Sequence, residues 1–163
     1  MSAQPIYTPA LGMRVLTPLY DTAIAAFTRE GAWRARLVSQ IAPQAGMRIV
    51  DIGCGTGTLT RALKRAAPGA EVIGVDPDVE VLTKARATAA AEGLDIDYAE
   101  GFFDDAFVVD HGPFSAVTSS LVLHQVQLAE KAAILGTAFA ALAPGGRLHV
   151  ADYGVQPGIL MRF

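Results

Sequence analysis

The chain has 163 residues, enough for one globular domain that buries roughly two thirds of its unfolded surface. Apolar residues make up 52% of it, charged residues 18%, and the net charge is −3, which excludes a disordered chain and leaves no basic field for nucleic acid. No apolar run reaches the roughly 18 residues of a membrane span and no secretory signal opens the chain, so we expect a cytoplasmic protein whose single cysteine, Cys54, stays reduced.

Two helices are predicted before the first strand. Thr17 and Pro18 are typical of an N-cap and a first helical position, and this helix should stop at Gly31. The second helix should end before Pro43. Its apolar residues recur at helical spacing: Trp33, Leu37, Val38 and Ile41. We expect a single domain over 1–163, with cap helices in 1–45, a core in 46–153 and a tail in 154–163.

From residue 46 onward, apolar strands alternate with helices. The strands are predicted at 48–52, 71–75, 94–99, 114–119 and 147–152, and a loop with a short helix at 102–112. The inward-facing helix residues are Leu59, Ala62, Leu63 and Ala66 before Pro68-Gly69; Val81, Leu82, Ala85 and Ala89 before Gly93; and Ile134, Leu135, Ala138, Phe139 and Leu142 before Pro144-Gly145-Gly146. This alternation predicts an α/β fold with a doubly wound, Rossmann-like parallel sheet, whose ligands bind at the carboxyl ends of the strands.

The most informative segment is VDIGCGTGTLT, residues 50–60. A buried strand ends there, and Gly53, Gly55 and Gly57 should let the backbone turn tightly and approach a ligand. The helix that follows points free N–H groups into the same space. Asp51 is expected at the rim as an acceptor for a cationic or hydroxyl-bearing group.

The glycine spacing separates two kinds of nucleotide site. A dinucleotide fingerprint would place its third glycine at position 58, which is Thr58. A preceding Asp51 with glycines at alternate positions instead resembles the class I methyltransferases that depend on S-adenosylmethionine (SAM). A glycine-rich turn without a ligand is the plainer alternative.

Asp76 ends the second strand in IGVDPD, where a carboxylate can accept both hydroxyls of an adenosine ribose. The alternative is that Asp76 caps the N-terminus of the following helix, a role that Asp78 fills better. A carboxylate that contacts a ribose would also suit NAD, so this residue does not by itself distinguish the two cofactors. The neighbouring Pro77 is included in the predicted cofactor site.

The loop after the third strand departs from the family's usual Gly-Asp-Ala. It reads Gly101-Phe102-Phe103, so we expect an aromatic face and a backbone N–H near Phe103 to hold the adenine instead, with Asp104 as a displaced acidic residue. Both phenylalanines could equally be core residues.

The segment FSAVTSSLVLHQV, residues 114–126, resembles the family's fourth motif. The resemblance implies that backbone groups of Ser119 and its neighbours Ser120 and Leu121 meet the methionine half of the cofactor. His124 is a weak candidate for a catalytic base, and the alternative is that it has a purely structural role. Two further histidines read as loop and strand residues: His111 and His149.

Near the N-terminus, Tyr20-Asp21 resembles an element of ubiquinone/menaquinone-type methyltransferases, in which the tyrosine lies near the cofactor carboxylate. Arg14 could add charge there, or these residues could lie on a helix surface. Cys54 belongs to the predicted cofactor turn, as a small apolar filler rather than a nucleophile.

The resemblance covers about 11–163 and implies a seven-stranded sheet ordered 3-2-1-4-5-7-6, with SAM as donor and S-adenosylhomocysteine (SAH) as product. This sequence supplies five strands in the order 3-2-1-4-5, with the usual strands 6 and 7 missing. We therefore expect an incomplete C-terminus and an exposed fifth strand through which two copies pair as a homodimer.

Methylation of a small-molecule acceptor is the predicted function, with no metal and no residue that every such enzyme requires. Two alternatives stay open: a SAM-binding module without turnover, and an NAD(P)-dependent oxidoreductase.

Overall fold

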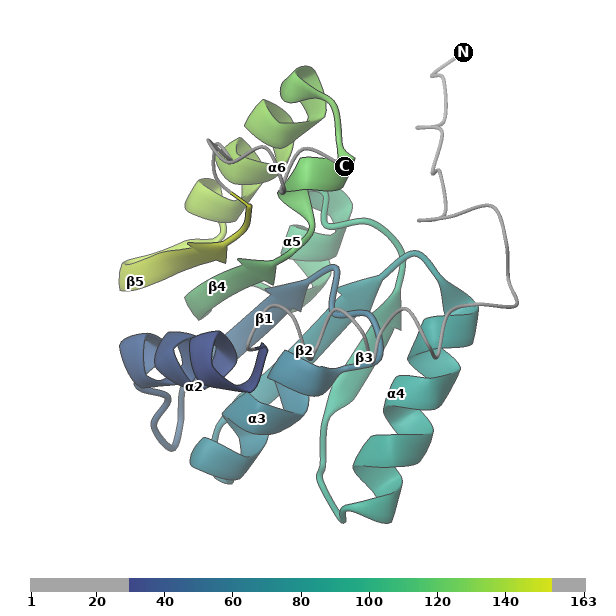
Figure 1. The fold of residues 1–163 in the computed structure, drawn as a ribbon. Coiled ribbons are helices and arrows are strands. Elements are labelled where there is room, and N and C mark those ends of the chain that lie inside the picture. The colour runs from purple at the N-terminus through teal and green to yellow at the C-terminus, as the bar shows by residue number, and fades with distance from the viewer. Residues whose placement is uncertain (1–29, 154–163) are drawn as a thin grey trace. The chain divides into compact units, whose positions relative to one another are not determined.

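Five parallel strands form the centre of the computed structural model, which describes residues 30–153 (Figure 1). Their order is β3-β2-β1-β4-β5, and from Arg34 onward the described residues belong to one unit that contains the whole sheet. The strands are β1 (Arg48–Ile52), β2 (Glu71–Asp76), β3 (Asp97–Glu100), β4 (Phe114–Ser120) and β5 (Leu142–Ala151). The predicted doubly wound α/β fold and its strand order are confirmed.

The pairing register brings the carboxyl ends of three strands to one edge. Ile52, at the end of β1, lies opposite Val75 of β2 and Ser119 of β4. The strand order runs away from β1 on one side and from β4 on the other, so the β1–β4 boundary is the topological switch point of the sheet. Ligand crevices of open α/β sheets form outside the carboxyl ends at such a point.

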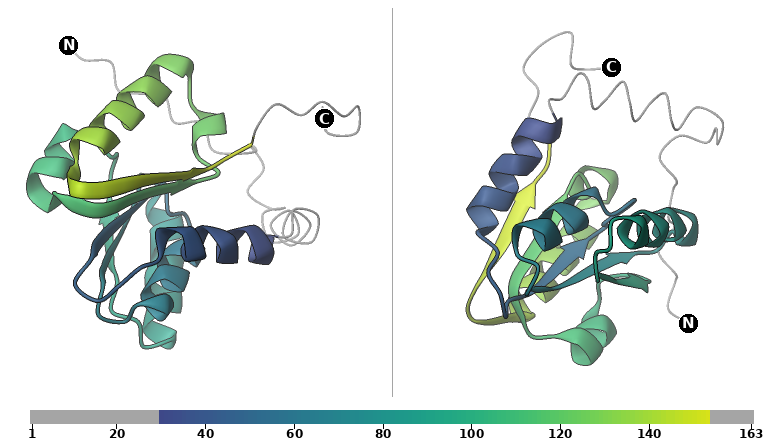
Figure 2. Two further views of the ribbon diagram at one scale, coloured as in Figure 1. Left: turned by 90° about the vertical axis from the view of Figure 1, so that its left-hand side faces the viewer. Right: turned by 90° about the horizontal axis from the view of Figure 1, so that it is seen from below.

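Helices cover both faces of the sheet (Figure 2). The helices α3 (Thr58–Ala66) and α4 (Val79–Ala91) lie on one face, and α5 (Asp105–His111) and α6 (Leu128–Ala140) on the other. The side chains of β1 alternate between the two faces of the sheet. Asp51 contacts α3, whereas Val50 and Ile52 join the core under α5 and α6. The remaining elements are α2 (Glu30–Ile41) and the short 3-10 helix η1 (Leu123–Gln125).

Aromatic rings fill the core under α5 and α6. Phe103 lies 5.4 Å from Phe107 and 6.5 Å from Phe114 between ring centroids, and Phe114 is fully buried. Such tilted contacts add stability beyond the area that the rings bury. This cluster anchors the segment between β3 and β4 to the sheet.

The capping of α4 explains why β3 is shorter than the predicted strand at 94–99. Asp78, and not Asp76, caps the start of the helix, as the sequence favoured. Gly93 ends the helix with a φ of +66°. The N–H of Leu94 then donates to the carbonyl of Ala89, as in a Schellman motif. Leu94 belongs to this cap, so the strand begins only at Asp97.

Four other sequence predictions differ from the structure. Gly31 lies inside α2 and does not separate two helices. The helix before β5 ends at Ala140 rather than at 144–146, because the glycines of that segment form an irregular start of β5: a Cβ at Gly146 would lie 2.9 Å from the carbonyl oxygen of Phe114. Phe139 is 76% exposed and Ala66 is also exposed, although their spacing predicted burial.

Candidate functional site

The glycine turn after β1 is held by the neighbouring strand. The N–H groups of Gly53 and Cys54 both donate to the carbonyl of Val75, at 2.8 and 3.1 Å. Gly53, Gly55 and Gly57 all have positive φ, of 63°, 54° and 74°, which residues with a Cβ rarely adopt. The sequence prediction of a tight glycine turn is therefore confirmed at all three positions.

The three glycines differ in what they face. A Cβ at position 53 would overlap the side chain of Val122, and one at position 57 would overlap the hydroxyl of Tyr98. A Cβ at Gly55 would meet nothing within 4 Å. Val122 and Tyr98 therefore occupy the space that a side chain at positions 53 and 57 would need, whereas the space beside Gly55 is open.

Asp76 ties this turn to the end of β2. One oxygen of its carboxylate accepts from the N–H of Gly55 at 2.9 Å, and the other from the N–H of Asp78 at 2.9 Å. The side chain is 8% exposed, and burial raises its pKa, against which the two backbone hydrogen bonds act. Each oxygen keeps a lone pair, so the carboxylate is placed to accept further hydroxyl groups beside Gly55.

Asp51 lies beneath the turn rather than at its rim, in contrast to the sequence expectation. It is 1% exposed and accepts a hydrogen bond from the Thr60 hydroxyl of α3 at 2.9 Å. Burial raises its pKa to about 7, with Thr60 and the charge of Arg34 opposing this. Its second oxygen has no hydrogen-bond partner within the described residues.

The end of β4 completes the edge. Ser119 is 3% exposed, and its hydroxyl, like that of Thr118, has no hydrogen-bond partner in residues 30–153. Leu121 then takes a φ of +58°, an unusual value for a leucine, and its N–H donates to the carbonyl of Ala151. Strained backbone of this kind is concentrated at functional sites.

His124 of η1 pairs with a carboxylate beyond the end of β5. Its Nδ1 lies 2.8 Å from Asp152 Oδ1, and its backbone N–H donates to Asp152 Oδ2 at 3.2 Å. The other histidines lie elsewhere: His111 ends α5 with its ring against Phe107, and His149 lies within β5.

The two phenylalanines after β3 have separate positions. Phe103 is buried in the core under α5 and α6, whereas Phe102 is 48% exposed near the end of β3. Asp104 caps α5 by accepting from the N–H of Phe107 and is exposed. Phe102 and Asp104 are thus both exposed after β3, and Phe102 is the one with an exposed aromatic face.

Cys54 behaves as a filler of the turn. Its side chain is buried beside Gly74, where an added Cβ would lie 2.8 Å from the Cys54 Sγ. Burial raises the pKa of its thiol, so the nucleophilic thiolate is absent at neutral pH. Arg14, Tyr20 and Asp21 lie outside the described residues.

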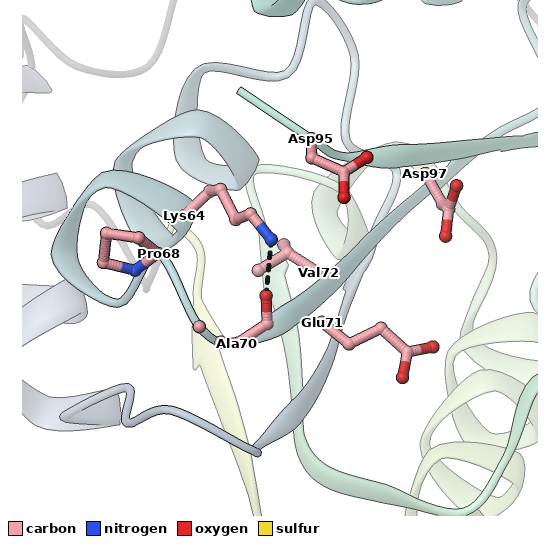
Figure 3. Close-up of a pocket in the computed structure, with 8 residues that line it drawn as sticks. Lys64, Pro68, Ala70, Glu71, Val72, Asp95 and Asp97 are labelled. Carbon is pink, nitrogen blue, oxygen red and sulfur yellow. Dashed lines mark hydrogen bonds between the residues drawn. The ribbon is translucent and has the colours of Figure 1, made fainter. Parts of the chain in front are cut away.

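A hollow of about 230 Å³ lies at the opposite, amino-terminal end of β2 (Figure 3). Its charged residues are Lys64, Glu71, Asp95 and Asp97, and Lys64 Nζ donates to the carbonyl of Ala70 at 2.7 Å. The hollow is open to solvent and lies away from the switch point, so we do not assign the site to it.

Comparison with known proteins adds to this geometry. Residues 49–146 match the family described as "Methyltransferase domain". The chain belongs to this methyltransferase family. The matched residues run from β1 to the irregular start of β5 and include the glycine turn, Asp76 and His124.

Curated relatives of this methyltransferase domain include quinone-pathway enzymes. It is 38% identical to the demethylmenaquinone methyltransferase of Thermus thermophilus, over 87% of this chain and 64% of that protein. It is 34% identical to a ubiquinone biosynthesis O-methyltransferase of Xylella fastidiosa, over 72% of this chain and 46% of that protein. The chain thus spans about half to two thirds of the length of these relatives.

Solved structures show the same fold at low sequence identity. Coclaurine N-methyltransferase bound to N-methylheliamine and SAH has a TM-score of 0.64 at 16% identity, covering 74% of this chain and 35% of that one. A precorrin-6y C5,15-methyltransferase from Geobacter metallireducens has a TM-score of 0.61 at 16% identity, covering 71% and 58%. The Rossmann-like architecture of this methyltransferase domain is therefore shared with them.

Three residues of the site were not predicted from the sequence. Val122 and Tyr98 lie over the glycine turn, and Asp152 holds His124. The only sequence signal for Asp152 is its place directly after an apolar strand, where parallel strands present their carboxyl ends. Among residues 30–153, no helix is long and apolar enough to cross a membrane, and no three metal-ligating side chains are grouped to hold an ion.

Proposed function

We propose that this methyltransferase domain binds SAM at the carboxyl ends of β1, β2 and β4 and transfers its methyl group to a small-molecule acceptor. The observation that carries the proposal is the pairing of Asp76 with Gly55. A buried carboxylate lies 2.9 Å from the N–H of the one glycine in the turn that faces open space.

The residues at this edge fit the chemistry of SAM. The Asp76 carboxylate suits the two ribose hydroxyls, and the exposed ring of Phe102 suits an adenine face. On the other side of the turn, Asp51 and Ser119 each have a buried oxygen without a partner within residues 30–153, which suits the amino and carboxylate groups of the methionine half. The N-cap of α3 is Gly57, which makes no side-chain cap, so the first N–H groups of the helix remain available to a carboxylate, apart from that of Thr60, which donates to Asp51.

Cys54 and Pro77 complete the proposed binding residues as neighbours of these groups, and Tyr20 stays part of the proposal. Gly53 and Gly57 act indirectly, because their lack of a Cβ lets Val122 and Tyr98 pack over the turn. SAM supplies an activated methyl group on a positively charged sulfur. The protein's own task is to align donor and acceptor, which can supply much of the rate acceleration.

For the acceptor, the curated relatives suggest a quinone-type small molecule, since one is named a demethylmenaquinone methyltransferase and another a ubiquinone biosynthesis O-methyltransferase. The composition of the sequence gives no support to a nucleic-acid acceptor.

The proposal is tested by calorimetry of the full chain with SAM, SAH and NAD. We expect SAM and SAH to bind and NAD not to bind. Asp76→Ala should weaken SAM binding by about 1–3 kcal/mol, because the ribose loses a buried acceptor. The matched control is Asp78→Ala, which removes the neighbouring carboxylate that caps α4. An equal loss of SAM affinity in both variants would remove Asp76 from the site.

The same measurement separates the two alternative functions. A binding module without turnover would bind SAM tightly but methylate no acceptor. An oxidoreductase would bind NAD(P) in preference to SAM, which Thr58 in place of a third fingerprint glycine argues against.

We also propose that two copies pair through β5. This strand ends the sheet within the described residues, and Val150 on it is 43% exposed. Sedimentation should show a dimer that Val150→Lys dissociates, whereas the control Val109→Lys, at an 83% exposed position of α5, should leave it intact. A monomer at high concentration would refute the pairing.

A cytoplasmic location is proposed on the buried free thiol of Cys54, which suits a reducing compartment. Cell fractionation tests it, and recovery of the chain outside the cytoplasm would contradict it.

A further inference from the structure

His124 and Asp152 are joined by two contacts, one at the imidazole ring and one at the backbone N–H of His124. The ring nitrogen Nδ1 of His124 lies 2.8 Å from Asp152 Oδ1, and the backbone N–H of His124 donates to Asp152 Oδ2 at 3.2 Å. The Tyr153 ring lies edge-on to the imidazole, with centroids 4.9 Å apart and planes at 73°. The ring of His124 is thus held in one orientation.

The protonation of the pair follows from its chemistry. Burial opposes ionisation of Asp152, but hydrogen bonds from the backbone N–H of Tyr153 and from His124 outweigh it and lower the pKa of the carboxyl group. An ionised carboxylate can only accept, so Nδ1 of His124 must carry the proton that it shares with Asp152. The other ring nitrogen, Nε2, then has a free lone pair in the neutral imidazole.

The location of the pair is the same sheet edge as the proposed SAM site. His124 lies in η1, two residues after Val122, whose side chain lies over Gly53 of the glycine turn. Asp152 directly follows β5, whose Ala151 pairs with Ser120 at the end of β4. The imidazole side chain is 34% exposed and that of Asp152 13%, so the base can be reached while its partner is shielded.

We propose that His124 is the general base that takes the proton of an acceptor hydroxyl, and that Asp152 is its positioning residue. The inference rests on the proposed function and adds the class of acceptor: a phenol or enol methylated on oxygen. Neutral amines carry a free lone pair and need no base for this reaction, whereas a phenol is a poor nucleophile until its proton leaves.

The acceptor oxygen forms a bond to the methyl carbon while the carbon–sulfur bond of SAM breaks, and both electrons of that bond stay on sulfur, giving SAH. The hydroxyl proton moves to Nε2 of His124. The resulting imidazolium is stabilised by the Asp152 carboxylate and returns its proton to water after SAH leaves.

The kinetic test uses the full chain and two phenols that differ in acidity. Catechol keeps its proton at neutral pH, whereas the nitro group of 4-nitrocatechol makes its hydroxyl far more acidic. We expect His124→Gln to lower the methylation rate of catechol by about 10²–10⁴-fold and that of 4-nitrocatechol by less than about 10-fold. Asp152→Asn should lower the catechol rate in the same selective way, with kcat affected more than KM. His111→Gln, remote from the edge, is the matched control and should leave both rates unchanged.

A spectroscopic test needs no turnover. Long-range ¹H–¹⁵N spectra of the histidine side chains should show a signal, absent in His124→Gln, with its proton on Nδ1. In Asp152→Asn this tautomer preference should be lost, because the amide can also donate. An unchanged tautomer in Asp152→Asn would contradict the positioning role.

The outcomes separate this inference from the proposed function. Failure to bind SAM refutes the proposed function. Binding of SAM with no methylation of either phenol overturns the inference alone. Equal rate losses on both phenols in His124→Gln would also overturn it, since they would show a structural role that ties η1 to β5.

Discussion

At the carboxyl end of the sheet, Asp51 and Ser119 are buried with polar atoms that have no partner in the described residues. At the amino end, Arg48 and Glu71 form a two-pronged ion pair in partial contact with solvent, with both hydrogen bonds at 2.8 Å. Within the described residues, β1 thus begins at the paired Arg48 and ends near Asp51, one oxygen of which has no partner, and Ser119 of β4 adds a second such atom at the same edge.

This difference indicates that the carboxyl end of the sheet is less stable than it would be if all its buried polar atoms had partners. A buried polar atom without a partner costs free energy, and Asp51 and Ser119 carry such atoms at the carboxyl end. Positive φ at a residue with a Cβ occurs on both sides of the sheet, at Leu121 after β4 and at Ala42 before β1, so it does not distinguish the two ends. Natural proteins retain such features where a ligand supplies the missing contacts. The following substitutions test the contrast, from the largest expected effect to the smallest.

The largest effect is expected from the buried carboxyl of Asp51. Its pKa rises from an ordinary 3.8 to about 7 in the folded protein, so the folded state holds a proton that the unfolded state releases. Stability should therefore fall as pH rises through this interval, by on the order of 4 kcal/mol between about pH 4 and pH 8. Urea unfolding across this range measures the slope.

The control for that slope is Asp51→Asn, which keeps an oxygen for the Thr60 hydroxyl but cannot ionise. Its stability should depend less on pH, and its advantage over the parent chain should grow with rising pH. Equal slopes in the two proteins would show that Asp51 is ionised in the folded state.

The second effect distinguishes two glycines of one turn. Gly53→Ala should lower the free energy of unfolding by about 3 kcal/mol, through positive φ and overlap with Val122. Gly55→Ala carries the φ penalty alone, about 1–2 kcal/mol, because no atom lies near its Cβ. Denaturant titration of both variants measures the difference.

A double-mutant cycle with Val122→Ala isolates the overlap. The cost of Gly53→Ala should shrink in the Val122→Ala background, while that of Gly55→Ala should stay the same. If Gly53→Ala costs no more than Gly55→Ala, then Val122 does not occupy the space over Gly53.

These contacts also mark what the sequence could and could not predict. The strands and the glycine turn follow from local patterns, because apolar runs and glycine spacing act within a few residues. Val122 over Gly53 and Asp152 on His124 join segments far apart in the chain, the second pair 28 residues apart. Such contacts depend on strand register and side-chain direction, which no local pattern encodes.

Burial was predicted well for α4 and less well for α6. Leu82, Ala85 and Ala89 of α4 are buried as their spacing indicated. Phe139 has the same helical spacing on α6 but is 76% exposed, because α6 packs on the edge strand β5, which is itself only partly buried. Helical periodicity identifies an apolar face but not the area of sheet available to cover it.

A smaller effect is expected at the two unpartnered hydroxyls of β4. Ser119→Ala and Thr118→Val should each raise stability by about 1 kcal/mol, since each removes a buried oxygen without a partner within residues 30–153. Only Ser119→Ala should also weaken SAM binding, because Ser119 alone belongs to the proposed site. Thermal unfolding and calorimetry on the same samples measure both quantities, and a loss of affinity in Thr118→Val instead would exchange the roles of the two residues.

The smallest effect is expected at the amino end, where Glu71→Gln breaks the ion pair with Arg48. The two side chains are 35% and 46% exposed, so solvent screens their attraction and the loss should be at most about 1 kcal/mol. Raising the salt concentration should reduce this loss further, because ions screen exposed charges but not buried ones. Arg48 also keeps its hydrogen bond to the carbonyl of Gly112 when Glu71 is replaced, which limits the loss again. A cost at Glu71 as large as that at Gly53, persisting in high salt, would mean that both ends of the sheet are built under the same strain, and the contrast between them would no longer locate the site.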